Sequence, residues 1–369
     1  MLYYHSCWPR ASILQSIQEH SGTHLSSNSK PKRNQCPVFV VGCHRSGTNL
    51  LYDILLSAGG FAVYRGYLPI YNMLMPHVGK LNKLENRSKL MDIWLRSQGF
   101  RRSGLDAAEL REKVLRECNT AGDFARIIMD AVAQMQNVSR WALYEPDNVL
   151  YIPEIKRELP GALFVHMVRD GRDIALSLTK MGGFQPLLWD RGTRALEATA
   201  MYWEWTVRKG QHYGRMFPAD YIEVHYEQLV TQPQVVLKQL SEFLDHDLDY
   251  QRIQSSSLGR LRESNSSFLG EQAADGQANP VNRWRSRLTR EEVVRLESMT
   301  ADCLSDLGYE LTTLEQQRRR GLREDCMRFA YPKFLNTKLW LKTKTFLRRY
   351  SSLAALELAD PIAQVGSVQ

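Results

Sequence analysis

The feature that most constrains the fold is a short strand-like run that leads through a glycine-containing turn into a helix. Residues 38–41 read Val-Phe-Val-Val, a continuous β-branched and aromatic run typical of a strand covered on both faces. Residues 42–49 read Gly-Cys-His-Arg-Ser-Gly-Thr-Asn, and apolar side chains then recur at helical spacing to about Leu56. Backbone N–H groups that turn inward in such a loop, with the positive end of the helix behind them, favour a bound phosphate group.

Three further short runs have the composition of strands, and helical patterns separate them. The strand-like runs are residues 141–144, 162–168 and 221–224, and the helical patterns are residues 72–140, 174–180 and 194–210. Asp173 stands where it can cap the helix 174–180. Strands that alternate with helices predict an α/β fold, in which a central parallel β-sheet is flanked by helices in three layers.

The net charge of +8, from 48 Lys and Arg against 40 Asp and Glu, is unevenly distributed. Residues 318–349 hold 11 of the basic residues and only two acids, so residues 1–317 carry a net charge of +1. A Ser-, Asn-, Lys- and Pro-rich stretch ends the first 36 residues. We therefore predict a flexible N-terminal arm (1–36), one folded domain (37–317) and a basic amphipathic tail (318–369).

The six cysteines are scattered without a C-x-x-C pair, which favours free thiols in a reducing compartment. No stretch approaches the roughly 20 apolar residues that span a bilayer, and residues 1–25 contain no uninterrupted apolar signal segment. No cluster of metal-ligating residues is visible, so we expect no metal cofactor. These patterns predict a cytoplasmic protein.

The loop of residues 42–49 differs from a nucleotide-binding P-loop in one decisive position. Gly42 and Gly47 have the P-loop separation, but Thr48 follows where the P-loop carries its lysine. A basic residue, Arg45, stands inside the loop instead. The missing lysine disfavours a P-loop kinase, which stays the competing enzyme class. A strand–helix turn that binds nothing is the structural alternative.

Residues 44–49, His-Arg-Ser-Gly-Thr-Asn, resemble the 5′-phosphosulfate loop of sulfotransferases that use 3′-phosphoadenosine 5′-phosphosulfate (PAPS). That loop reads P-R-S-G-T-T or P-K-S-G-T-T, so a histidine replaces the proline and an asparagine replaces the last threonine. The arginine form is similar to the tyrosylprotein and bacterial carbohydrate branch, and the resemblance implies the P-loop NTPase-like sulfotransferase fold. It assigns the 5′-phosphosulfate to the loop residues Gly42, His44, Arg45, Ser46, Gly47, Thr48 and Asn49.

A second motif resembles the family's site for the 3′-phosphate, an arginine at a strand end and a serine eight residues later. Arg169 and Ser177 have this spacing, and a guanidinium offers a planar fork to two phosphate oxygens. Alone, Arg169 could equally form a structural ion pair.

Two later segments extend the resemblance. His-Tyr-Glu-Gln-Leu-Val at 225–230 is similar to the family's R-Y-E-D-L-V stretch, which places Tyr226 near the nucleotide or in the core. Asn-Arg-Trp-Arg at 282–285 resembles a late basic-Trp segment that implies a 3′-phosphate contact for Arg283 and an adenine contact for Trp284. The polar residues 254–282 before it would close over the cofactor.

Sulfonyl transfer needs stabilisation of charge on the leaving phosphate and a base for the acceptor hydroxyl. We assign Arg45 to the first task. For the second, the resembling tyrosylprotein enzymes carry a Glu about two dozen residues after the loop arginine, where this chain has no carboxylate. Glu145 is our candidate base, and Tyr144 replaces a lysine of the family there; Asp147 and His77 are weaker candidates, and Glu145 could instead cap a helix.

The sequence thus predicts a PAPS-dependent sulfotransferase that acts on a hydroxyl, or less favourably an amine, of a carbohydrate, lipid or other small molecule. Residues 66–140 and 181–215 should build the acceptor pocket. A non-catalytic membrane-surface protein is the non-enzyme alternative. Nucleic acid is not an expected partner, because no groove-reading motif accompanies the basic tail.

The tail supports either of two interpretations. On a helical wheel, one broad face is apolar and carries Leu335, Leu339, Trp340, Phe346, Leu347 and Tyr350. The other face is basic and carries Lys338, Lys342, Lys344, Arg348 and Arg349. Residues 326–350 could therefore lie on an anionic membrane surface, which would make the protein peripheral to a membrane. The alternative is a helix that docks its apolar face on the domain.

Overall fold

The structure is a computed structural model that describes residues 32–180, 193–256 and 281–345, together with residues 353, 356 and 358. The chain divides into a short N-terminal unit, Met1–Lys32, and a second unit, Arg33–Gln369. Most of the predicted arm (1–36), most of the predicted closing loop (254–282) and the end of the basic tail lie outside the described residues.

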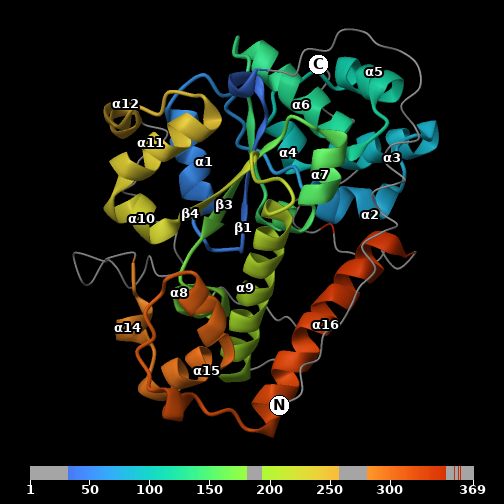
Figure 1. The fold of residues 1–369 in the computed structure, drawn as a ribbon. Helices are drawn as coiled ribbons and strands as arrows, with labels where there is room; N and C mark the ends of the chain where they lie inside the picture. Colours follow the sequence, from blue (N-terminus) through green and yellow to red (C-terminus); the bar gives the residue numbers. More distant parts are fainter. Residues whose placement is uncertain are drawn as a thin grey trace. The chain divides into compact units, whose positions relative to one another are not determined.

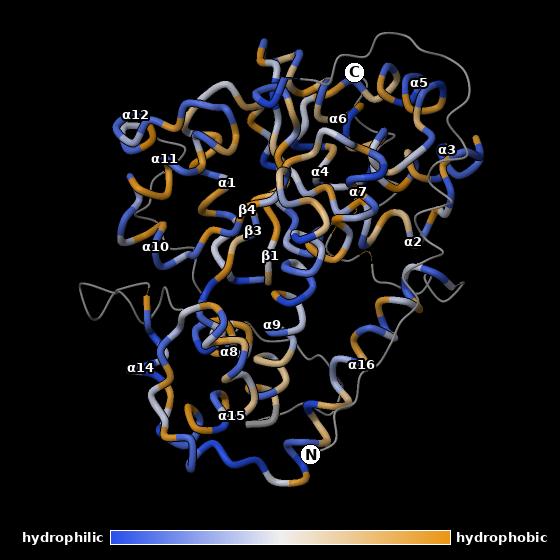
Figure 2. Tube along the Cα trace, viewed as in Figure 1, coloured by the Kyte–Doolittle hydropathy of each residue, from blue (hydrophilic) through white to orange (hydrophobic). Residues whose placement is uncertain are grey.

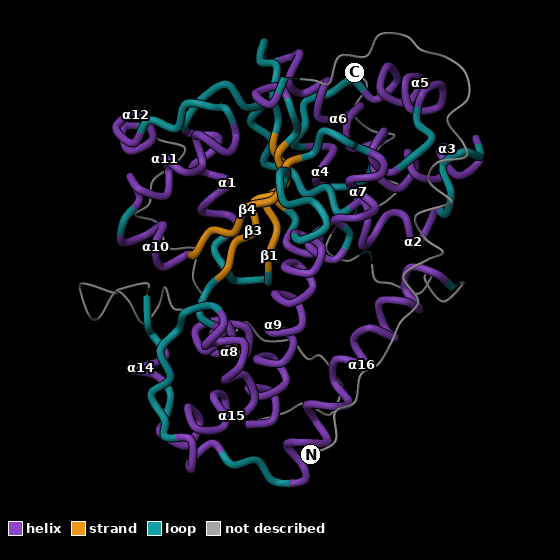
Figure 3. Tube along the Cα trace, viewed as in Figure 1, coloured by secondary structure: helices purple, strands orange, loops and turns teal. Residues whose placement is uncertain are grey.

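A four-stranded parallel sheet is the centre of the second unit (Figure 3). Its strands are β1 (Val38–Gly42), β2 (Ala142–Tyr144), β3 (Leu163–Val168) and β4 (Tyr221–His225). They lie in the order β2-β1-β3-β4, and every neighbouring pair is parallel. All four predicted strands and their parallel arrangement are therefore confirmed.

Alternate side chains of β1 face two different apolar clusters, as expected for a strand buried on both faces. Phe39 and Val41 join one cluster, and Val38 and Val40 join the other. The first cluster is covered by α3 (Leu84–Trp94), α5 (Ala107–Glu117), α6 (Ala121–Met135) and α7 (Ile152–Glu158). The second is covered by α1 (Thr48–Ser57), α10 (Tyr226–Thr231), α11 (Pro233–Leu244) and α12 (Tyr250–Ser255), seen apart from the first group in Figure 1. The predicted three-layer α/β fold is confirmed.

Several short helices lie between β1 and β3, and one more precedes β1. They are the π-helix η3 (Ile70–Leu74), α2 (Met75–Val78), α4 (Gln98–Arg101) and the 3-10 helix η4 (Pro146–Leu150), with η2 (Arg33–Gln35) before β1. The predicted helical character of residues 72–140 therefore appears as several separate helices.

Helices beyond the carboxyl ends of the strands form a further group (Figure 1). These are α8 (Gly171–Lys180), α9 (Thr193–Gly214), α14 (Trp284–Arg287), α15 (Arg290–Asp306), η5 (Glu315–Arg318) and α16 (Leu322–Lys344). Helix α8 begins three residues earlier than predicted, and the Asp170 carboxylate accepts from the backbone N–H of Arg172 at 2.9 Å. Asp170 therefore precedes the first residue of α8, and Asp173, the predicted cap, lies inside the helix.

Helix α16 docks on α9. The indole N–H of Trp205 donates to Asn336 Oδ1 at 3.1 Å, and the Arg328 guanidinium donates to Glu204 Oε2 at 3.3 Å. Leu335 is buried, whereas Trp340 from the same predicted apolar face is 57% exposed. Polar and apolar residues alternate along α16 in Figure 2. Residues 346–350 of the predicted amphipathic helix lie outside the described residues.

Five cysteines within the described residues are free thiols, and four of them are buried. Among those same residues no helix is both long and apolar enough to span a membrane.

Candidate functional site

The four segments that carry the predicted site residues meet at one edge of the sheet. The loop of residues 43–47 follows β1, Glu145 follows β2, Arg169 follows β3, and Tyr226 follows β4. Because the strands are parallel and in register, their carboxyl ends lie together. This is the edge at which open α/β sheets bind ligands.

Three unusual backbone conformations shape the phosphate loop. Gly42, Arg45 and Gly47 have φ angles of 151°, 72° and 94°. A Cβ atom on Gly47 would lie 2.4 Å from the ring of Tyr226, so only glycine fits there without movement of that ring. Ser46 is fully buried, and its hydroxyl donates to Cys43 O at 2.7 Å. This hydrogen bond stabilises the turn of the loop.

The two predicted phosphate motifs contact each other directly. Arg45 Nε donates to Ser177 Oγ at 3.0 Å, and Arg169 Nη1 donates to the carbonyl oxygen of Arg45 at 3.2 Å. The Arg169 guanidinium also stacks over the ring of Tyr226, 4.3 Å from its centroid. Tyr226 therefore lies between Gly47 and Arg169 and supports both motifs.

Arg283 joins these two arginines from a distant part of the chain. The backbone N–H of Trp284 donates to Asp173 Oδ1 at 2.9 Å, and Asp173 Oδ2 lies 3.5 Å from Arg169 Nη2. Burial and then the positive charge of Arg169 lower the pKa of Arg45 and of Arg283. Mutually repelling guanidiniums at one place fit a bound group with several negative charges.

Trp284 lies beside two other arginines, and Asn49 lies in the first turn of α1. The Trp284 ring is buried, with the Arg172 guanidinium 3.8 Å and the Arg285 guanidinium 4.7 Å from its centroid. Thr48 is buried at the start of α1, while Asn49 is exposed. The first N–H groups of a helix have no intrahelical acceptor, so this end of α1 can donate to an anion. The cofactor contacts assigned to these residues stay predictions.

A buried ionic network, which the sequence analysis did not identify, fixes the end of β3. Arg172 Nη2 lies 2.7 Å from Asp170 Oδ2, and Arg172 Nη1 lies 2.6 Å from Glu297 Oε1 on α15. Glu227 Oε1 accepts from the backbone N–H of Asp170 at 2.9 Å, and Glu227 Oε2 accepts from the Tyr309 hydroxyl at 3.0 Å. These contacts hold the turn that presents Arg169. Glu227, Glu297 and Tyr309 are too far from this turn in sequence for a local pattern to reveal these contacts.

Glu145 is a buried carboxyl group at the end of β2. It is 2% exposed, and neither of its oxygens has a hydrogen-bond partner of normal geometry among the described residues. The Tyr67 hydroxyl and the Asp147 backbone amide lie close by. Burial, and then the negative charge of Asp147, raise the pKa of Glu145 to about 8. Such a group is a stronger base than an ordinary glutamate.

Asp147 and His44 form an ion pair beside Glu145. His44 Nε2 lies 3.1 Å from Asp147 Oδ1, and Asn72 Nδ2 donates to Asp147 Oδ2 at 2.8 Å. Burial alone would lower the pKa of His44, but the charge of Asp147 raises it to about 9. Burial would raise the pKa of Asp147, but His44 and the hydrogen bonds hold it well below its usual value. The charge of Asp147 therefore favours the protonated form of His44, which precedes Arg45 in the loop.

The predicted acceptor segments supply some of the groups around these carboxylates. Tyr67 and Asn72 come from residues 66–140, and Tyr202 of α9, whose pKa is raised first by burial and then by Asp147, comes from residues 181–215. Residues 181–192 lie outside the described chain. His77, the other weak candidate, lies on α2. The described residues hold no cluster of three or more His, Cys, Asp or Glu with metal-site geometry.

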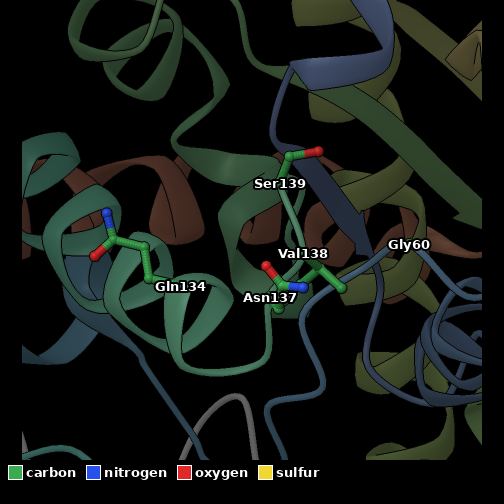
Figure 4. A pocket seen from close by; sticks show the side chains of 5 residues that line it. All are labelled: Gly60, Gln134, Asn137, Val138 and Ser139. Carbon is green, nitrogen blue, oxygen red and sulfur yellow. The ribbon is translucent and has the colours of Figure 1, made fainter.

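A depression of about 550 Å³ is present at the opposite edge of the sheet (Figure 4). It is lined by Gly60, Gln134, Asn137, Val138 and Ser139. Gly60 follows α1, and residues 137–139 precede β2, so the depression lies near the amino ends of the strands. It is separate from the site described above.

Comparison with known proteins gives a family match and several distant relatives. The sequence model described as "Sulfotransferase family" matches residues 37–250, more than half of the chain. A Caenorhabditis briggsae protein named "Putative protein-tyrosine sulfotransferase" is 22% identical over 305 residues, which cover 79% of this chain and 95% of that protein. A Caenorhabditis elegans protein of the same name is 24% identical over 171 residues, which cover 45% of this chain and 64% of that protein. The sulfotransferase domain of the Synechococcus PCC 7002 olefin synthase is a structural neighbour with a TM-score of 0.49 and 18% identity, covering 74% of this chain and 95% of that domain.

Proposed function

The chain belongs to the sulfotransferase family, and from this premise we propose that it transfers the sulfonyl group of PAPS to an acceptor hydroxyl. The observation that carries the proposal is the meeting of Arg45, Arg169 and Ser177 at the carboxyl edge of the sheet. Bound PAPS would supply the sulfonyl group and leave as 3′,5′-adenosine bisphosphate.

The donor side fits a nucleotide with two separate anionic groups. The loop of residues 43–47 and the first N–H groups of α1 would bind the 5′-phosphosulfate. Arg169, Ser177 and Arg283 would bind the 3′-phosphate, with guanidinium groups that match phosphate oxygens in pairs. The hydrogen bond from Arg45 to Ser177 connects the proposed 5′-phosphosulfate site with the proposed 3′-phosphate site, so Arg45 would lie near both anionic groups.

The residues of the acceptor side have the properties that in-line transfer requires. The Glu145 carboxylate would accept the proton of the acceptor hydroxyl, and its raised pKa of about 8 suits a weakly acidic alcohol. Arg45 and the His44 imidazolium would stabilise the negative charge that grows on the leaving phosphate. Asp147 keeps His44 protonated and is held in turn by Asn72.

For the acceptor we propose a hydroxyl of a carbohydrate, lipid or other small molecule. The tyrosine hydroxyl of a peptide is the second candidate, because two relatives carry a protein-tyrosine sulfotransferase name. A panel of glycan, lipid, small-molecule and tyrosine-peptide acceptors, incubated with radiolabelled PAPS, distinguishes them. Label in a tyrosine peptide alone would replace our proposed acceptor.

The same panel tests the reaction itself. We expect label transfer by the wild-type chain and a loss of transfer in Glu145→Gln, which keeps the shape of the side chain but removes the base. Full turnover by Glu145→Gln would eliminate Glu145 as the base. No transfer of label to any acceptor, together with ATP-dependent phosphorylation, would favour the kinase alternative.

An anionic membrane contact through residues 326–350 and a cytoplasmic location remain predictions. Docking of α16 on α9 uses part of the apolar face that the membrane prediction requires. Flotation with anionic vesicles tests the contact. Co-flotation that disappears at high salt supports it, and no co-flotation at low salt contradicts it.

A further inference from the structure

The π-helix η3 presents Asn72 to the carboxylates that follow β2. Its wide turn is closed by the backbone N–H of Leu74, which donates to the carbonyl oxygen of Pro69, five residues earlier, at 3.2 Å. Such turns are rare and occur frequently at functional sites. The hydroxyl of Tyr71 anchors the turn, because it donates to Glu158 Oε2 on α7 at 3.1 Å. Asn72 follows Tyr71 and is only 4% exposed.

The two ends of the Asn72 amide have different surroundings. Asn72 Nδ2 donates to Asp147 Oδ2 at 2.8 Å, whereas Asn72 Oδ1 is buried and has no hydrogen-bond partner among the described residues. Asp147 fixes this orientation, because a flipped amide would place its oxygen against a carboxylate oxygen and both atoms are acceptors. His44 lies 3.1 Å from the other oxygen of Asp147 and holds that carboxylate in turn. Asn72 Oδ1 is therefore an acceptor of fixed position.

Glu145 supplies further acceptor atoms near the amide of Asn72. Both of its carboxyl oxygens are also buried without a partner in the described part of the chain. The Tyr67 hydroxyl lies against η3, 3.9 Å from Met73 Sδ, and is close to both Glu145 and Asn72. One hydroxyl carries one proton, so it can donate to Glu145 or to Asn72 but not to both. Because a buried acceptor without a donor is unfavourable, this place favours a molecule that brings more than one donor.

We propose that Asn72 Oδ1 selects acceptors that carry a second hydroxyl beside the one that is sulfonated, so that the acceptor is a polyol such as a sugar. This inference rests on the proposed function and specifies its substrate class. The reacting hydroxyl gives its proton to Glu145, and its oxygen bonds to sulfur while the bond from sulfur to the phosphate oxygen breaks and leaves its electron pair on that oxygen. The neighbouring hydroxyl keeps its proton and donates it to Asn72 Oδ1. A simple alcohol or a tyrosine side chain has one hydroxyl only and would leave Asn72 Oδ1 unpaired.

Cyclohexanol and the cis and trans forms of 1,2-cyclohexanediol are suitable probes, because they differ only in the second hydroxyl. We would measure kcat/KM for label transfer from PAPS to each probe with the wild type, Asn72→Ala and Gln136→Ala. Gln136→Ala is the matched control, because it removes a side-chain amide whose oxygen and nitrogen are both paired with the backbone of Val63.

We expect the wild type and Gln136→Ala to prefer at least one diol over cyclohexanol by about 10- to 100-fold, because the simple alcohol leaves a buried acceptor unpaired. Asn72→Ala should reduce that preference to less than about threefold. The ratio between the probes cancels any loss that they share, including the loss of the hydrogen bond to Asp147. A wild-type preference below threefold, or an unchanged preference in Asn72→Ala, would overturn the inference.

Binding of 3′,5′-adenosine bisphosphate separates this inference from the proposed function. If the wild type neither binds it nor transfers label, the proposed function fails, and saturation-transfer NMR of the same probes with the full chain still reports whether a diol is preferred. If the wild type and Asn72→Ala bind it equally and neither prefers a diol, only the role of Asn72 is refuted. Should Asn72→Ala lose this binding, Asn72→Leu replaces it, because leucine fills a similar volume without the amide.

Discussion

Asp147→Asn should move the whole pH profile of the enzyme to lower pH. In the proposed active form Glu145 is ionised and His44 is protonated. With pKa values of about 8 for Glu145 and about 9 for His44, kcat/KM should follow a narrow bell centred between them. Because the pKa of Glu145 is raised above neutrality, kcat/KM should still increase from pH 7 to pH 8 as Glu145 ionises.

The direction of the shift in the pH profile follows from the effect of the Asp147 charge on Glu145 and on His44. The Asp147 charge raises the pKa of Glu145, because two neighbouring carboxylates repel, and it raises the pKa of His44, 3.1 Å away, because opposite charges attract. Removal of that charge lowers both values. For His44 the loss should be about 1–3 pH units, the usual effect of an opposite charge in contact. The two apparent pKa values of the bell-shaped profile belong to the coupled group of Glu145, His44 and Asp147 rather than to single residues. The acidic and the alkaline side of the profile must therefore be fitted together.

The assay is kcat/KM for transfer from PAPS, measured from pH 6 to 10 for the wild type and for Asp147→Asn. Asn72→Ala, which removes the other hydrogen bond to Asp147 but no charge, is the control and should move the limbs much less. Acidic and alkaline sides of the kcat/KM profile that move apart, or that both move to higher pH, would refute the electrostatic reasoning.

Three further outcomes test the donor side and its support. Arg45→Ala should lower kcat by about 10²–10³, as expected for loss of one preorganised charge-stabilising donor, and a loss below threefold at saturating PAPS would remove Arg45 from the mechanism. Gly47→Ala should weaken binding of 3′,5′-adenosine bisphosphate, because its Cβ would lie 2.4 Å from an aromatic ring; Gly308→Ala, at a φ of 78° with open space around it, is the calorimetric control. Glu297→Ala should reduce the free energy of unfolding in urea by about 3–5 kcal/mol, because it breaks the buried pair with Arg172, and a loss under about 1 kcal/mol would contradict that role.

The residues proposed to bind the donor nucleotide could be predicted from the sequence because they lie in short, continuous segments. The loop of residues 42–49 is continuous, and Arg169 and Ser177 are connected by one turn and one helix. The strand order, which places β1 beside β3, then brings the two motifs together. The direct contact between Arg45 and Ser177 required the structure, since 132 residues separate them.

The acceptor side was less predictable because its groups come from separate parts of the chain. Glu145 was proposed from its strand end, but its isolation from hydrogen-bond partners depends on packing. His44 was assigned to the cofactor alone, and its pair with Asp147 joins two segments 103 residues apart. Helical periodicity predicted the apolar face of α16 correctly at Leu335 but not at Trp340, which is 57% exposed, since a wheel does not contain the surface on which the helix docks.

We expect the arginine cluster to recognise the 3′-phosphate of the donor nucleotide. The assay is calorimetric titration of the full chain with 3′,5′-adenosine bisphosphate, 5′-AMP and ATP–Mg²⁺, with Arg169→Ala as the variant. Each charge-assisted hydrogen bond contributes about 1.5–3 kcal/mol, so the bisphosphate should bind at least about tenfold more tightly than 5′-AMP, and Arg169→Ala should remove most of that preference. Equal binding of the bisphosphate and 5′-AMP, or a preference for ATP–Mg²⁺, would contradict the account.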